Sequence, residues 1–87
     1  GPPTTQVRPF LSAYRAHRLE REAQILARLQ AGDRTVAEIV PTLYASVDPR
    51  LWPAASLSVL AHLVKLVVEG RATVAGEPSL GAVFGAT

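Results

Sequence analysis

Few residues in this chain have the types and spacing that catalysis or metal binding requires. The only histidines, His17 and His62, fall on different expected helices, and the chain contains no cysteine. Neither histidine belongs to a ligand set with the usual metal-binding spacing, and there is no glycine-rich phosphate loop. The serines lack the context of a nucleophile elbow. We therefore expect no catalytic, cofactor-binding or metal-binding residue here, and we interpret both histidines as surface or interface residues.

One pair of opposite charges stands in apolar surroundings. Arg18 and Glu22 are spaced i, i+4, so they can pair on a helix. They project into the expected buried arc of that helix, which comprises Phe10, Leu11, Tyr14, Ile25, Leu26 and Leu29. A buried pair needs further hydrogen bonds to offset its desolvation. Two compatible interpretations follow: a partly covered ion pair with its arginine stem along apolar surface, or a face covered by another domain.

The stretch from Ser56 to Arg71, SLSVLAHLVKLVVEGR, predicts the central helix. Ser58, His62, Lys65 and Glu69 share one narrow stripe of this helix, and every other residue between Val59 and Val68 is apolar. The remaining positions are apolar over roughly 220°, about twice what a surface helix needs. The stripe is nearly neutral, unlike the base-reading face of a DNA-recognition helix. Nucleic acid is therefore weakly supported as a partner, and its contacts would be Lys65 and Arg71. Val64 and Val68 need cover from a second domain or a symmetry partner.

Two more helices and a hairpin are expected around this one. The first helix should run from about Pro9 to Gln30. Thr35 and Glu38 form a capping box that opens the second helix, which Pro41 should kink or shorten.

Asp48-Pro49 should begin a separate helical turn that leads into the central helix, with Trp52 as a core anchor. The strands expected after Gly70 are Arg71–Ala75 and Leu80–Phe84. The order helix, helix, helix, hairpin predicts a mainly α fold with a small β-hairpin, a winged-helix domain.

Composition limits the class of protein and the cellular location that we expect. Hydrophobic residues make up 48% of the 87 residues, which excludes a disordered chain and fits one domain. Residues 1–8 are expected to be a linker or tag remnant, and residues 9–87 the domain. The absence of cysteine favours an intracellular, cytoplasmic location. Polar residues interrupt the longest apolar run, so no membrane partner is expected. The chain contains no Met, which indicates a piece of a longer protein.

Two segments, His17–Leu29 and Thr42–Ala72, resemble a known family. It is the winged-helix domain that follows the catalytic domain in a branch of metallo-β-lactamase-fold hydrolases, the branch that includes endoribonuclease-like β-lactamase-like proteins. The family's His-Arg-x-x-Arg-Glu helix is matched by His17, Arg18, Arg21 and Glu22. Its later motifs are matched, in order, by Leu43-Tyr44, Asp48-Pro49, Trp52-Pro53, Ala61 to Leu66 and Glu69-Gly70.

The resemblance implies an accessory C-terminal domain that packs on the catalytic domain of a hydrolase and helps to shape its substrate cleft. Arg18, Arg21 and Glu22 would dock on that partner. Zinc would lie in the partner's catalytic site, with no cofactor in this chain. The alternatives are a nucleic-acid-binding module that uses Lys65 and Arg71, and a homodimerisation domain.

Overall fold

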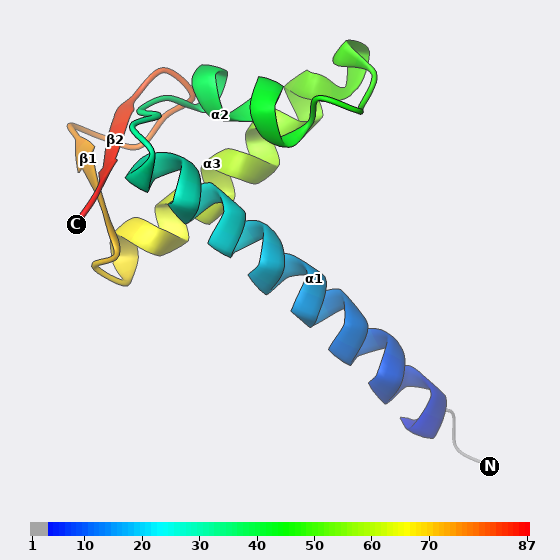
Figure 1. The fold of residues 1–87 in the computed structure, drawn as a ribbon. Helices are drawn as coiled ribbons and strands as arrows, with labels where there is room; N and C mark the ends of the chain where they lie inside the picture. The colour runs from blue at the N-terminus through cyan, green and yellow to red at the C-terminus, as the bar shows by residue number, and fades with distance from the viewer. Residues whose placement is uncertain (1–3) are drawn as a thin grey trace.

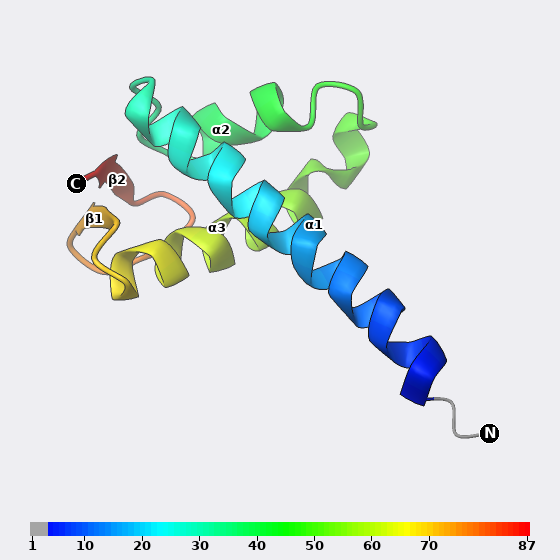
Figure 2. The same cartoon turned by 60° about the horizontal axis from the view of Figure 1, so that its bottom comes forward.

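The computed structural model describes residues 4–87, with side chains from residue 10 onward. Its elements follow the order α1 (Thr4–Gln30), α2 (Val36–Leu43), the 3₁₀ turn η1 (Pro49–Leu51), α3 (Trp52–Val68), β1 (Ala72–Ala75) and β2 (Val83–Ala86). The expected order of three helices and a hairpin is confirmed. In both ribbon views, α1 crosses α3 and its N-terminal half projects away from the other elements (Figures 1 and 2).

Every element except η1 contributes to a single core. Its buried side chains are Ile25 and Leu29 from α1, Val36, Ile39 and Val40 from α2, Val59, Leu63 and Leu66 from α3, and Ala72, Ala82 and Phe84 from the hairpin region. The three residues of α3 follow helical spacing and present one face to the other elements. The helix therefore stands at the centre of the fold, but only this face of its wide apolar arc is buried, and Leu57 and Val68 are 60% and 81% exposed.

Helix α1 differs from expectation at its N-terminal half. It begins at Thr4 rather than near Pro9, so residues 4–8 are helical. Residues 1–3 lie outside the described residues, and the division into 1–8 and 9–87 stays a prediction. Phe10, Leu11 and Tyr14 were expected in the core, but each is more than half exposed. A helix of 27 residues is about 40 Å long, and the other elements cover only its C-terminal half.

The expected cap of α2 is present. The Thr35 hydroxyl accepts a hydrogen bond from the Glu38 amide at 3.2 Å, and a Glu38 carboxylate oxygen accepts one from the Thr35 amide at 3.1 Å. These two bonds satisfy amide groups that the first helical turn leaves unpaired. The helix is short, and it ends at Leu43, two residues after the internal Pro41.

The separate turn before α3 is also confirmed. Asp48 caps η1 by accepting a hydrogen bond from the Arg50 amide at 2.9 Å. Helix α3 then begins at Trp52, four residues before the expected Ser56. The indole of Trp52 donates to the Tyr44 carbonyl at 3.1 Å and packs on the core, so it anchors this end of α3.

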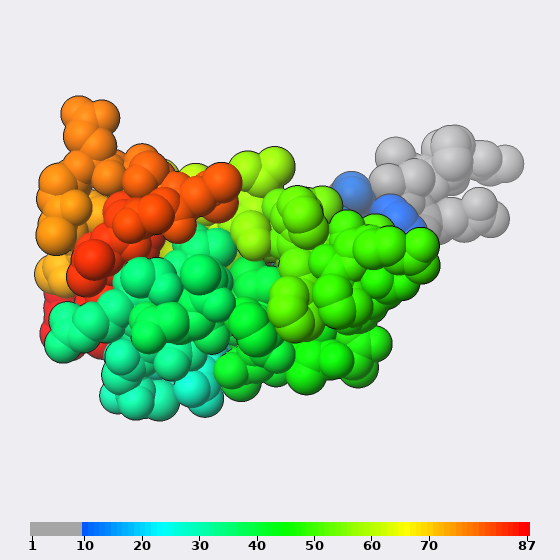
Figure 3. Space-filling view, turned by 90° about the horizontal axis from the view of Figure 1, so that it is seen from above, coloured from blue at the N-terminus to red at the C-terminus, as the bar shows by residue number. Residues whose placement is uncertain are grey.

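The hairpin is antiparallel, with Ala72 opposite Ala86 and Ala75 opposite Val83. Its second strand begins at Val83, three residues later than expected, because the Ala82 amide donates to the Ser79 carbonyl and closes a turn there. The Phe84 amide donates to the Arg34 carbonyl at 2.7 Å. Figure 3 shows the result, with the hairpin residues (orange to red) lying against the teal residues that follow α1.

Within residues 4–87, one segment is long and apolar enough to cross a membrane. It is Pro49–Val68, with a mean hydropathy of 1.7. We expected polar residues to interrupt any segment of this kind, and that expectation is wrong, because this segment meets the criteria of length and composition. In the fold this segment is η1 followed by α3, whose buried side chains form the centre of the core. Core helices pass the same test, so the finding alone is weak evidence for a membrane span.

Candidate functional site

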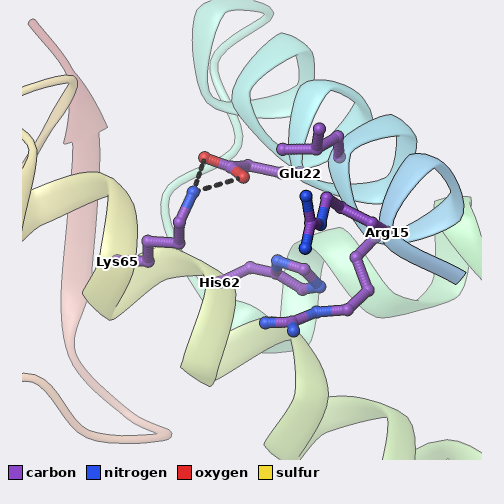
Figure 4. A pocket seen from close by; sticks show the side chains of 6 residues that line it. Arg15, Glu22, His62 and Lys65 are labelled. Atoms are coloured by element: carbon purple, nitrogen blue, oxygen red, sulfur yellow. Dashed lines mark hydrogen bonds and ion pairs between the residues drawn. The ribbon is translucent and has the colours of Figure 1, made fainter. Parts of the chain in front are cut away.

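A buried carboxylate on α1 connects this helix to α3 and to the start of the hairpin. Glu22 of α1 is 3% exposed and accepts hydrogen bonds from the Lys65 ammonium at 2.8 and 3.1 Å. Arg71, just before β1, donates to the same carboxylate at 3.2 Å. Figure 4 shows Lys65 reaching across from α3 to both oxygens of Glu22. A buried carboxylate requires such partners, and this one ties α1 to α3 and to the start of the hairpin.

Glu69 completes this group of ion pairs. It lies 3.1 Å from Lys65 and 3.4 Å from Arg71. The pKa of Lys65 is raised above its ordinary value because Glu22 and then Glu69 accept hydrogen bonds from the ammonium. The pKa of Glu69 is lowered, chiefly by its hydrogen bond from Lys65. We call Glu22, Lys65, Glu69 and Arg71 the charged cluster.

The expected pairing of Arg18 with Glu22 is therefore wrong. The Glu22 carboxylate is instead paired with Lys65 from the opposite helix and with Arg71. The Arg18 guanidinium instead lies 5.9 Å from the centre of the Tyr14 ring. The missed partner had a signal in the sequence, because Lys65 stands on the only polar stripe of an otherwise apolar helix.

Arg21 is also engaged within the domain. Its guanidinium lies 4.4 Å from the centre of the Tyr44 ring, a cation–π distance. It also donates to the Leu43 carbonyl at 3.5 Å. Arg21 therefore holds the end of α2 against α1.

A pocket of about 150 Å³ lies between α1 and α3. We call it the α1–α3 pocket, and its walls are Arg15, Arg18, Leu19, Glu22, His62 and Lys65. In Figure 4 the Arg15 side chain extends from α1 toward His62 on α3. A second hollow, of about 270 Å³, also includes Arg18 and His62 and is otherwise lined by Tyr14, His17, Arg21, Tyr44 and Ser58. Three residues of the expected exposed stripe, Ser58, His62 and Lys65, thus line hollows beside α1.

The α1–α3 pocket has an excess of positive charge. Among the side chains that the structure describes, neither Arg15 nor Arg18 has a carboxylate within ion-pair distance. Residues 1–9 contain no Asp or Glu that could supply one. Glu22 lines the pocket, but Lys65 and Arg71 already offset its charge.

His62 lies between these charges and is partly buried. Burial lowers the pKa of its imidazole, and the cations Arg18, Lys65 and Arg21 lower it further against the opposing effect of Glu22. We therefore expect a neutral ring at pH 7, able to accept or donate one hydrogen bond. His17 is exposed on the surface of α1.

The cationic side chains around the α1–α3 pocket suit the binding of an anion. The described residues offer no group of three or more His, Asp or Glu side chains that could hold a metal ion, so they do not fit a zinc site. Val64 and Val68 were both expected to need cover from another domain or a second copy. They differ in exposure, since Val68 is 81% exposed and Val64 is partly buried.

A comparison with protein families supports the fold directly. The model of the family described as "Beta-lactamase associated winged helix domain" matches residues 35–81, more than half of the chain. The match runs from the cap of α2 through α3 and β1, so it contains His62, Lys65 and Arg71, while the arginines of α1 precede it. No curated protein matches the chain. The chain therefore belongs to the beta-lactamase associated winged helix domain family.

Proposed function

We propose that this winged-helix domain is an accessory module that packs against a β-lactamase-fold catalytic domain and carries out no chemistry itself. Zinc and the hydrolysis that it promotes would belong to that partner, in the cytoplasm, with this domain forming part of the wall of the substrate cleft. The observation that carries the proposal is an exposed apolar run on α1. The family description supplies the partner, because it associates this domain with β-lactamase.

The exposed run continues the face of α1 that forms the core. At 100° per residue, Leu11 and Tyr14 fall on the same side of the helix as Ile25 and Leu29. The latter two are buried against the body of the domain, whereas Phe10, Leu11 and Tyr14 are 51–72% exposed. Contiguous exposed apolar surface marks sites of interaction. A second domain seated on this face would extend the core stripe along the whole helix.

The expected docking residues take different parts in this proposal. Arg18 lies beside the apolar run with no carboxylate partner among the described residues, so it is free to pair with the catalytic domain. Glu22 and Arg21 are engaged within this domain, by the charged cluster and by Tyr44. Their role would be to hold α1 at the angle that docking requires.

Tyr14→Ser in the full-length gene product tests the docking face. A large side chain contributes about 1.5–3 kcal/mol when it is fully buried, so the substitution should weaken coupling between the two domains. Calorimetry should then separate one unfolding transition into two. The matched control is Leu57→Ser on α3, because Leu57 is 60% exposed and Tyr14 is 59% exposed. In the isolated 87-residue chain, Tyr14→Ser should leave the unfolding temperature unchanged. Equal calorimetric profiles for the two full-length variants would contradict the proposal.

A specific observation also favours a second function, the binding of single-stranded nucleic acid. Arg18 lies 5.9 Å from the ring centre of the exposed Tyr14, with Arg15 next in the chain, and basic side chains near an aromatic platform are typical of single-strand binding. The expected contacts Lys65 and Arg71 are instead occupied by Glu22 and Glu69. Salt-dependent binding should therefore be lost on changing the arginines of α1. A gel shift that stays blank at low salt would exclude this function.

Homodimerisation through Val64 and Val68 stays a prediction, which sedimentation of the isolated chain would test.

A further inference from the structure

We propose that the α1–α3 pocket is a binding site for a phosphate group, held by the guanidinium groups of Arg15 and Arg18 with His62 beside them. All residues of this site belong to the domain, so the isolated chain tests it, whereas in a docked complex the catalytic domain and the phosphate would compete for Arg18.

The charges of the pocket favour an anion with several oxygen atoms. Arg15 and Arg18 bring two guanidinium forks without a carboxylate partner among the described residues. Arginine forks match phosphate oxygens with paired, charge-assisted hydrogen bonds. The one carboxylate in the wall, Glu22, already accepts three hydrogen bonds from Lys65 and Arg71. Its repulsion of a bound anion is therefore offset.

The size of the pocket limits what it can hold. Its volume is about 150 Å³, whereas pockets for whole drug-sized ligands begin at roughly 300 Å³. The pocket should therefore take one phosphate group and leave any attached molecule outside. Leu19 supplies an apolar part of the wall, and it is itself 54% exposed, so the pocket opens to solvent on the α1 side.

The pocket is held open by the fold on both sides. Arg15 and Arg18 come from α1, and His62 and Lys65 come from α3. The 2.8 Å contact between Lys65 and Glu22 joins the two helices at one end of the pocket. A bound phosphate would thus meet donors from two helices whose separation is already set, which reduces the entropic cost of binding.

The experiment follows the amide and imidazole NMR signals of the 87-residue chain during titration with inorganic phosphate. We expect saturable shifts at His62 and at the α1 amides around Arg15 and Arg18, and a rise in the pKa of His62 as the anion binds. Arg15→Gln with Arg18→Gln should weaken binding at least tenfold, because two charge-assisted donors are lost. Arg34→Gln is the matched control, since Arg34 is an exposed arginine outside the pocket, and it should bind phosphate like the unchanged chain.

Three further titrations define the ligand. Adenosine monophosphate that binds more tightly than phosphate would support the proposal and identify the phosphate as part of a larger molecule. Equal affinity would also support it and identify free phosphate. Acetate that binds as well as phosphate would overturn the proposal, because the pocket would then be a site for a carboxylate. Absence of saturable shifts at His62 would overturn it as well, as would equal weakening by Arg34→Gln.

Discussion

Replacing Glu22 by Gln should remove a large part of the stability of this domain. The carboxylate is 3% exposed and accepts three hydrogen bonds from two cations. Glutamine keeps nearly the same volume, so no cavity forms. It removes the negative charge, however, and it turns an amide nitrogen toward the Lys65 ammonium, where one donor then faces another.

The size of the effect follows from these contacts. A hydrogen bond to a charged group contributes about 1.5–3 kcal/mol and a neutral one about 0.5–1.5 kcal/mol. One bond lost and two weakened would cost about 4 kcal/mol on this basis. The side chains of Lys65 and Arg71 are 44% and 49% exposed, so they regain water when the charge is removed. We therefore expect Glu22→Gln to lower the free energy of unfolding by about 2–3 kcal/mol.

That loss is measurable by urea unfolding followed by circular dichroism. A domain of this size has a total free energy of unfolding of about 4–13 kcal/mol, and the midpoint temperature should fall by about 10–20 °C. The control is Glu20→Gln, which removes an exposed carboxylate two residues away and should change the free energy by less than about 0.5 kcal/mol. Lys65→Met should lower the free energy of unfolding by less in the Glu22→Gln variant than in the unchanged chain, because its partner is already lost. If Glu22→Gln were as stable as Glu20→Gln, the charged cluster would contribute nothing and the reasoning would fail.

Three other substitutions test separate parts of the fold. The pKa of His62 is lowered by burial and by nearby cations, so below the ordinary value of 6.5 the unfolded chain binds more protons. Stability should be fully present above that pH and fall as the pH drops through the lowered pKa, and His62→Gln should flatten this dependence in a series of urea unfolding curves. Thr35→Ala should cost about 1 kcal/mol by removing the cap of α2, whereas Thr35→Ser should keep it; equal midpoints for the two variants would contradict this. Phe84→Ala should cost about 3–5 kcal/mol because the ring is 1% exposed, and the exposed Leu80→Ala should change little in the same assay. A comparably small loss at Phe84 would show that the hairpin is not part of the core.

Local patterns in the sequence determined most of the architecture. The capping box at Thr35 and the Asp48-Pro49 turn each depend on neighbouring residues, and both were confirmed. The wide apolar arc of α3 is buried on one face only, at Val59, Leu63 and Leu66. The start of β2 was placed three residues early, because the turn that delays it is closed by a backbone hydrogen bond at Ser79 that composition does not encode.

Only the tertiary structure decided which charges meet and which apolar residues stay exposed. Glu22 was expected to pair within its own helix, at the spacing that sequence reveals, but its partners Lys65 and Arg71 lie 43 and 49 residues away in the chain. Such contacts depend on how the helices cross, which periodicity does not specify. The exposure of Tyr14 also depends on the packing of the helices. Its position on the apolar arc predicted burial, but the other elements do not extend far enough along α1 to cover it. The sequence by itself determined the face of each helix, and the packing of α1 across α3 decided how far along that face the core extends.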